Sequence, residues 1–222
     1  MKCLANIEAN QIILSIENIE TKELKNTVCA AFFKEINGKY VKTFSKDYPE
    51  VELIQKNFPR MAETMFTGRN SNWRKSLISF ADVCKQKNIE WYLSGSCCEA
   101  VRGMPINPHD IDVHIFTEQF YDVRDVFPEY IMEPFQDLGN SWTVRYFGRL
   151  CVEGIQMDVA ADEKANLNNH EYSSVDWNGI QILLEPVELR LEIEKVRNRK
   201  DRIDMILDYI NRQEIVNKQH TK

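Results

Sequence analysis

Leu93-Ser94-Gly95-Ser96 and, after thirteen intervening residues, Asp110-Ile111-Asp112-Val113 are the segments that decide the fold of this chain. A glycine–serine pair ends one apolar run, and two carboxylates stand one residue apart at the start of the next. On a strand, residues i and i+2 point to the same face, so that Asp110 and Asp112 project side by side. Two like charges this close repel, and hard oxygen ligands at this spacing suit Mg²⁺. The pattern predicts a metal and phosphate site.

The Gly95-Ser96 pair stands at a predicted turn between a strand over 89–94 and a short helix from Cys97 to Arg102-Gly103. Free backbone N–H groups and the helix dipole favour an anion at such a turn, and glycine permits the close approach of a phosphate. Taken alone, the pair favours a plain tight turn with a serine N-cap. Likewise, Asp110 and Asp112 fit either a metal pair or the polar edge of a solvent-facing strand.

A third carboxylate, Asp158, lies in the apolar segment Ile155-Gln156-Met157-Asp158-Val159. Three carboxylates around a phosphate-binding turn suit two Mg²⁺ ions that clamp a nucleoside triphosphate. On this interpretation Asp110 and Asp112 bridge the two ions, while Asp158 holds the ion beside an acceptor hydroxyl and takes its proton. Asp162 follows in a polar loop and is interpreted as a turn residue.

The order of Gly-Ser, a short helix, Asp-x-Asp and a later isolated Asp resembles the nucleotidyltransferase superfamily related to DNA polymerase β. The nearest likeness is to the small bacterial antibiotic and minimal nucleotidyltransferases, and it covers roughly residues 73–211. The closing segment, in which Lys195 is followed by Arg199-Lys200-Asp201 and Asp204, is similar to the end of those relatives.

The resemblance implies the transfer of a nucleoside monophosphate from ATP or another nucleoside triphosphate to a hydroxyl, with Mg²⁺. It assigns Asp110, Asp112 and Asp158 to catalysis and to two metal ions. It also implies binding of the triphosphate by the following residues: Gly95, Ser96, Arg102, Lys195 and Lys200. For the two lysines, a solvated position on a terminal helix is the alternative interpretation.

The expected fold belongs to the α/β (α+β) class, as a nucleotidyltransferase-type mixed β-sheet flanked by helices. Residues 1–70 are expected to form a small N-terminal α/β module of unknown role, and residues 71–222 a catalytic domain that ends in a helical pair. The polar stretch 67–72 is the predicted boundary. The expected strands are 11–16, 40–44, 89–94, 110–116, 142–147, 154–159 and 180–184, and the expected helices are 21–36, 49–65, 73–87, 97–102, 117–127, 188–197 and 200–209.

Composition limits the class of protein. The 222 residues are 43% hydrophobic and 28% charged, as in a globular domain, and no apolar run is long enough to span a bilayer. The six cysteines show neither CxxC nor zinc-site spacing, so we expect reduced core thiols and a cytoplasmic location. A net charge of −6 argues mildly against a dedicated nucleic-acid binder.

Three hypotheses of function follow. The first is an enzyme that acts on a hydroxylated small molecule, since carboxylate-rich clefts attract cationic acceptors. The second is nucleotidylation of a protein or tRNA, which favours a basic groove such as Arg145, Arg149 and the 197–202 cluster could supply. The third is a nucleotide-binding module that has lost catalysis, for which a missing carboxylate is the expected signature, and none is missing.

Overall fold

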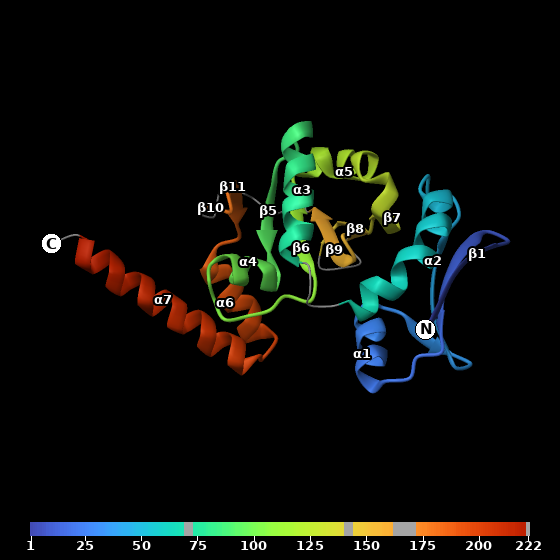
Figure 1. Ribbon diagram of the computed structural model, residues 1–222, viewed down its shortest axis with the longest axis horizontal. Coiled ribbons are helices and arrows are strands. Elements are labelled where there is room, and N and C mark those ends of the chain that lie inside the picture. The colour runs from blue at the N-terminus through green and yellow to red at the C-terminus, as the bar shows by residue number, and fades with distance from the viewer. Residues whose placement is uncertain (69–72, 140–143, 162–171, 221–222) are drawn as a thin grey trace.

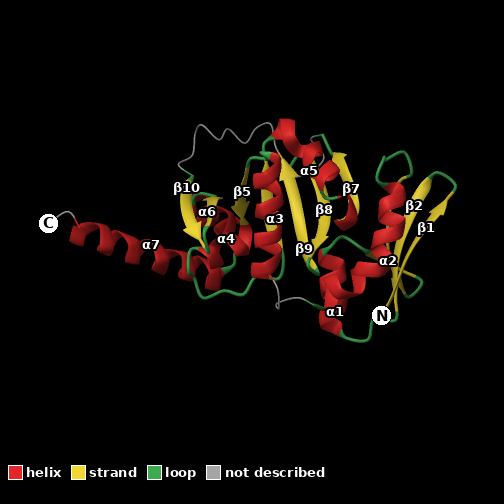
Figure 2. Ribbon diagram, turned by 45° about the horizontal axis from the view of Figure 1, so that its top comes forward, coloured by secondary structure: helices red, strands yellow, loops and turns green. Residues whose placement is uncertain are grey.

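The computed structural model of this protein describes residues 1–68, 73–139, 144–161 and 172–220. Its strands form two sheets (Figures 1 and 2). A four-stranded antiparallel sheet has the order β1-β2-β4-β3, and a seven-stranded mixed sheet has the order β10-β11-β5-β6-β9-β8-β7. The predicted α/β class with a mixed sheet flanked by helices is confirmed.

The N-terminal elements surround the small sheet. They are β1 (Lys2–Glu8), β2 (Gln11–Glu17), α1 (Lys22–Ala30), β3 (Lys34–Ile36), β4 (Lys39–Ser45) and α2 (Val51–Thr67). The helix predicted over 21–36 is wrong in its second half, because the chain reverses at Phe32, whose φ is 67°. The Phe33 N–H there donates to the Val28 carbonyl oxygen at 3.3 Å, which closes α1 and frees the next residues to pair with β4.

The larger sheet carries the candidate site. Its elements are α3 (Trp73–Lys87), β5 (Trp91–Ser94), α4 (Gly95–Val101), β6 (Ile111–Ile115), the 3₁₀ turn η1 (Thr117–Gln119), α5 (Phe120–Val126), the 3₁₀ turn η2 (Pro128–Tyr130), β7 (Ile131–Asp137), β8 (Tyr146–Val152), β9 (Ile155–Ala161), β10 (Ser173–Trp177), β11 (Ile180–Leu184), α6 (Val187–Val196) and α7 (Lys200–His220). β6 runs parallel to β9, and β11 runs parallel to β5. The other pairs in this sheet are antiparallel.

Besides β3, which replaces the end of the expected helix over 21–36, four strands differ from expectation. β1, β7 and β10 were not predicted, and the strand expected over 142–147 begins outside the described residues and in the structure runs from Tyr146 to Val152. The sequence of β7 does not alternate between apolar and polar residues, because its pairing with β8 shifts register on both sides of Glu133. Such irregularities turn apolar and polar side chains out of simple alternation. The residue Asp162 also lies outside the described part of the chain.

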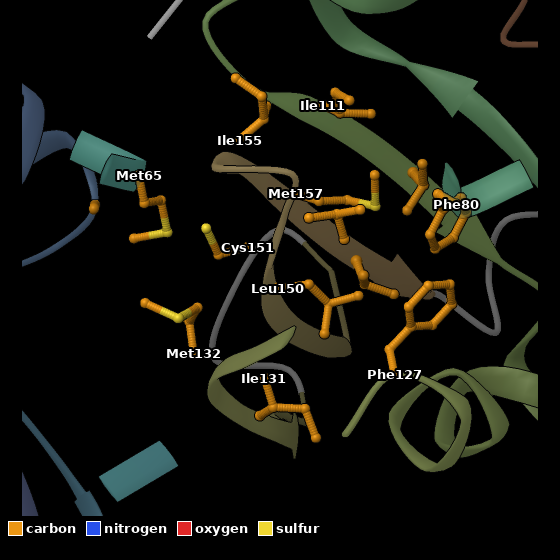
Figure 3. Packing of buried hydrophobic residues seen from close by; sticks show 14 of the residues in the cluster. Met65, Phe80, Ile111, Phe127, Ile131, Met132, Leu150, Cys151, Ile155 and Met157 are labelled. Carbon is orange, nitrogen blue, oxygen red and sulfur yellow. The ribbon is translucent and has the colours of Figure 1, made fainter. Parts of the chain in front are cut away.

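One hydrophobic core extends through both sheets. It joins Ile12 and Ile16 of the small sheet to Phe58 and Phe66 of α2 and to Met157 of β9. Figure 3 shows Met65 of α2 beside Cys151 and Met132, while Phe80 and Phe127 pack on the other side of β9. α2 therefore connects the small sheet to the larger one. The predicted boundary between residues 70 and 71 lies outside the described residues, and the division into two functional domains stays a prediction.

The opposite end of the molecule is formed by α6 and α7. Met104, Leu191 and Ile206 make a separate small cluster there, and α7 extends away from the body (Figure 1). Both helices were predicted, although α7 continues to His220 rather than ending near Tyr209. Throughout the described ranges, every helix lacks the combination of length and apolar character that crossing a bilayer requires.

Asn57 provides a test of the contact between α2 and β7. Its fully buried amide donates to the carbonyl oxygens of Pro128 and Ile131 at 3.0 and 3.1 Å. Asn57→Ala removes both of these buried hydrogen bonds, so we expect a loss of about 1–3 kcal/mol in the free energy of unfolding, measured by urea denaturation. The exposed Gln55→Ala in the same helix is the matched control and should change it by less than about 0.5 kcal/mol. Equal effects of the two variants would contradict this account.

Candidate active site

The turn between β5 and α4 is shaped by Gly95. Its φ is +64°, a conformation in which side chains are strained, and a Cβ at this position would stand 2.0 Å from the Asp112 Oδ2. The Asp112 carboxylate therefore occupies the space that glycine leaves empty. The order of residues in the predicted site has a direct steric reason, since the carboxylate of one segment packs against the glycine of the other.

Strand register places the charged residues in one line across the sheet. Ser94 pairs with Asp112, Asp112 with Asp158, Asp158 with Arg149, and Arg149 with Glu133. Directly paired residues share a face of the sheet, so these side chains form a continuous series. We call Asp112, Asp158, Arg149 and Glu133 the charged row. The predicted meeting of Asp112 and Asp158 is thus explained by two adjacent parallel strands.

The Asp112 carboxylate lies in an acidic environment beside Asp110 and Asp158. Burial raises the pKa of the Asp112 carboxyl well above its usual value, and the nearby charges of Asp110 and Asp158 raise it further. The Arg190 guanidinium lowers this pKa, but by less. A divalent cation bound by these oxygens would remove the repulsion, so the pair fits the Mg²⁺ that the sequence implies.

Asp158 has a different environment. Its Oδ1 accepts from the Arg149 Nε at 2.7 Å and its Oδ2 from the Arg149 Nη2 at 3.0 Å. The Gln156 amide donates to Oδ1 at 3.1 Å. In the described part of the chain, no three His, Cys, Asp or Glu side chains converge as a metal-binding group. Asp158 thus lies beside Asp112, yet its present partner is a guanidinium, and only its remaining lone pairs are left for an ion.

The expected phosphate-binding residues occupy different places. Ser96 is half-buried in the first turn of α4. Arg102, at the end of α4, donates to the Glu185 carbonyl oxygen and to the Cys98 Sγ, so that its guanidinium ties α4 to the end of β11. Lys195 pairs with Glu192 on the exposed surface of α6, and Lys200 is exposed at the start of α7. Their roles in triphosphate binding stay predictions.

A buried ionic cluster behind the turn was not predicted from the sequence. The Arg190 guanidinium of α6 contacts Glu99 of α4, Glu194 and Glu185, with nitrogen–oxygen distances of 3.4, 2.5 and 3.6 Å. Burial raises the pKa of the Glu185 carboxyl to about 6, although Arg190, Arg102 and a hydrogen bond from the Gly95 N–H oppose the rise. The cluster holds α4 through Glu99 and holds the Gly95 turn through the hydrogen bond to Glu185. Glu185, a lone acid between an apolar strand and Pro186, is the signal that could have revealed it.

Comparisons with known proteins agree with this geometry at the level of the fold. No family model and no curated protein matches the sequence. A candidate nucleotidyltransferase from Thermotoga maritima is 20% identical over 64% of this chain and 94% of its own, with a TM-score of 0.51. An antigenic nucleotidyltransferase-like protein from Paracoccidioides brasiliensis is 15% identical over 64% and 75% of the two chains, with a TM-score of 0.43. ANT(2")-Ia in complex with adenylyl-2"-tobramycin is 7% identical over 65% and 93%, with a TM-score of 0.48. The first likeness confirms the predicted nucleotidyltransferase-type fold.

Gly95→Ala tests the steric contact with Asp112. The new methyl group would overlap the Asp112 carboxylate, in addition to the cost of about 1–2 kcal/mol for a side chain at positive φ. Gly179→Ala is the matched control, because Gly179 has a φ of +79° with nothing within 4 Å of an added Cβ. We expect a clearly lower thermal midpoint for Gly95→Ala than for Gly179→Ala in differential scanning calorimetry. Identical midpoints would show that the contact is unimportant.

Asp112→Asn tests the electrostatic cost of the acidic pair. Because the folded-state pKa of Asp112 is raised above the unfolded value of about 4, folding without metal loses stability as pH rises through the interval between the two. With EDTA at neutral pH, the variant should therefore melt at least about 2 °C higher than the natural chain, and this gain should vanish at acidic pH. A lower midpoint at neutral pH would contradict the electrostatic account.

Proposed function

We propose that this protein is a Mg²⁺-dependent nucleotidyltransferase that moves a nucleoside monophosphate from a nucleoside triphosphate to a hydroxyl of a small molecule. The observation that carries the proposal is the Asp112 carboxylate packed against Gly95, with Asp110 and Asp158 close enough to raise its pKa. Acidic oxygens at a glycine–serine turn suit the joint binding of a divalent ion and a triphosphate.

Asp110 and Asp112 are the proposed primary ligands of the ions, with the remaining lone pairs of Asp158 as a further contact. When bound, divalent ions neutralise charge on the phosphates and favour loss of the acceptor proton. The Ser96 hydroxyl is proposed to donate to a phosphate oxygen at the start of α4. Glu185 and Arg190 hold the turn in its geometry but do not meet the substrate in this proposal.

The proposed reaction is a single displacement at the α-phosphorus. The acceptor oxygen forms a bond to that phosphorus while the bond from phosphorus to the bridging oxygen of pyrophosphate breaks. The hydroxyl proton passes to the Asp158 carboxylate, and from there to water. The catalytic contribution of the chain is mainly the alignment of the donor, the acceptor and the carboxylates.

A small acceptor is favoured because the basic residues that a nucleic-acid groove would need already pair with acidic residues of this chain. Arg149 is almost fully buried, and Arg145 pairs with Asp137 at 2.9 Å. Arg202 contacts the buried Glu99, and Arg197 and Arg199 lie within 4.0 Å of Glu194. Because these cations already have acidic partners, they form a poor track for phosphates. The acidic pair and the net charge of −6 favour an acceptor that carries amino groups.

The proposal predicts labelled product from α-phosphate-labelled nucleoside triphosphates with Mg²⁺. The four triphosphates should be tested separately against a panel of amino sugars and other hydroxylated amines, with tRNA and cell protein in parallel. We expect label in the small-molecule fraction, and a loss above about 100-fold for Asp110→Asn or Asp112→Asn, since even residues that only orient metal ligands cost about 10–100-fold.

Asp125→Asn, at an exposed acid of α5, is the control and should keep full activity. Label in tRNA or protein alone would instead select the macromolecular acceptor. Folded protein that binds Mg²⁺ and triphosphate without transferring label to any acceptor would select a silent binding module. Full turnover by Asp112→Asn would refute the assignment of the site.

A further inference from the structure

The charged row does not end inside the catalytic sheet but continues into the N-terminal part of the chain. Lys42 of β4 places its Nζ 2.5 Å from the Glu133 Oε2 and 3.0 Å from the Ala31 carbonyl oxygen. Arg149 contacts the same two residues, with its Nη1 2.7 Å from the Glu133 Oε1 and 3.3 Å from the Ala31 oxygen. A continuous path of direct contacts therefore runs from Lys42 through Glu133 and Arg149 to Asp158.

The early end of α1 makes this junction possible. The carbonyl oxygen of Ala31, the residue that caps α1, has no intrahelical donor, and the end of a helix carries partial negative charge. Two cations, Lys42 and Arg149, supply the missing hydrogen bonds. In a helix that continued to Ile36, as the sequence alone suggests, this oxygen would accept an intrahelical hydrogen bond instead. The reversal at Phe32 thus exposes an acceptor toward the catalytic sheet.

Charges alternate in sign along this path, and each depends on its neighbours. Burial would raise the pKa of the Glu133 carboxyl, but Arg149 and Lys42 outweigh it and lower that pKa. Burial also disfavours the charged form of Arg149, yet Asp158 and Glu133 raise its pKa above the usual value. Removal of Lys42 would leave Glu133 with one cation, and Arg149 would then be drawn toward Glu133 and away from Asp158.

Stability alone is a weak reason for this arrangement. Buried ion pairs are often replaced by apolar side chains of similar volume at little or no cost in free energy. Arg149 and Glu133 have side chains that are 1% and 2% exposed, whereas the Asp158 side chain is 18% exposed on the face that carries Asp112. The path thus begins in the N-terminal elements and ends on a single carboxylate of the candidate site.

We propose that Lys42, Glu133 and Arg149 are positioning residues through which the N-terminal elements, residues 1–68, hold the Asp158 carboxylate in its catalytic orientation. This inference rests on the proposed function for the role of Asp158, and it gives the N-terminal elements a part in the reaction. The three residues act through Asp158 and do not touch the substrate. Their loss should affect turnover more than donor binding, because Asp110, Asp112 and Gly95 stay in place.

Lys42→Met tests the inference, because methionine keeps most of the volume of lysine and removes its charge. We expect kcat to fall about 10–100-fold, as for other residues that orient an active-site ligand, with the KM for the triphosphate nearly unchanged. Lys39→Met is the matched control: Lys39 lies on the same strand and pairs with Glu17 at 2.5 Å on the surface. It should leave kcat and KM as they are.

Glu133→Gln combined with Lys42→Met separates positioning from simple destabilisation. The double variant removes both charges beyond Arg149, so that Asp158 no longer competes with the Glu133 carboxylate for this guanidinium. We expect it to recover part of the activity that Lys42→Met loses, so that the effects are not additive. Additive losses, or a kcat for Lys42→Met equal to that of the natural chain, would overturn the inference. If Lys42→Met does not fold, the isosteric Glu133→Gln and the charge-preserving Lys42→Arg carry the same comparison.

A readout that does not depend on turnover distinguishes this inference from the proposed function. The Nε–H of Arg149 donates to Asp158, and its NMR signal, assigned by its loss in Arg149→Lys, reports that bond. We expect Lys42→Met to shift this signal or increase its exchange with solvent, while Lys39→Met leaves it unchanged. If the natural chain transfers no nucleotide but the shift occurs, the proposed function fails and the positioning path stands. An unchanged signal in Lys42→Met refutes the path whatever the activity.

Discussion

The candidate site depends on one contact, the packing of the Asp112 carboxylate against a glycine that has no side chain to oppose it. Gly95 adopts positive φ, and the Asp112 Oδ2 fills the position where a Cβ would be. This contact joins β6 to the turn that begins α4. It also sets an acid beside Asp110 and Asp158, where its charge is unfavourable without a cation. A structure optimised for stability alone would avoid this arrangement, and its presence argues for binding of a positive ion.

The buried carboxylates in and beside the candidate site have two different electrostatic environments. Asp158 and Glu133 are compensated within the chain by Arg149 and Lys42. At Asp112, burial and the charges of Asp110 and Asp158 outweigh the opposing effect of Arg190. Because an arginine partner fixes a carboxylate in two directions, Asp158 is oriented before any ligand arrives. A bound cation would offset the remaining repulsion at Asp112.

The sequence was sufficient where the signal is local. Gly95, Asp112 and Asp158 stand out because each interrupts an apolar run, and β5, β6 and β9 follow from the same runs. The likeness to nucleotidyltransferases, confirmed for the fold, arose from their order. Arg149 and Glu133 interrupt apolar strands in the same way, yet the sequence does not show what they contact. Arg149 pairs with Asp158, and Glu133 pairs with Lys42, which lies 91 residues away in the sequence. No local spacing predicts such a partner, and the register shifts in β7 hide it further.

The end of α1 shows how a local error of prediction conceals a contact between distant segments. The apolar positions over 21–36 satisfy a helical period, so that propensity favours one long helix. Tertiary contacts outweigh this helical propensity. Because α1 ends at Ala30, β3 can pair with β4, and Lys42 and Arg149 can both donate to the Ala31 carbonyl oxygen. This oxygen then becomes a common acceptor for Lys42 of the small sheet and Arg149 of the large one. The N-terminal elements are consequently joined to the seven-stranded sheet by a shared core and by ion pairs, and these ion pairs continue to Asp158.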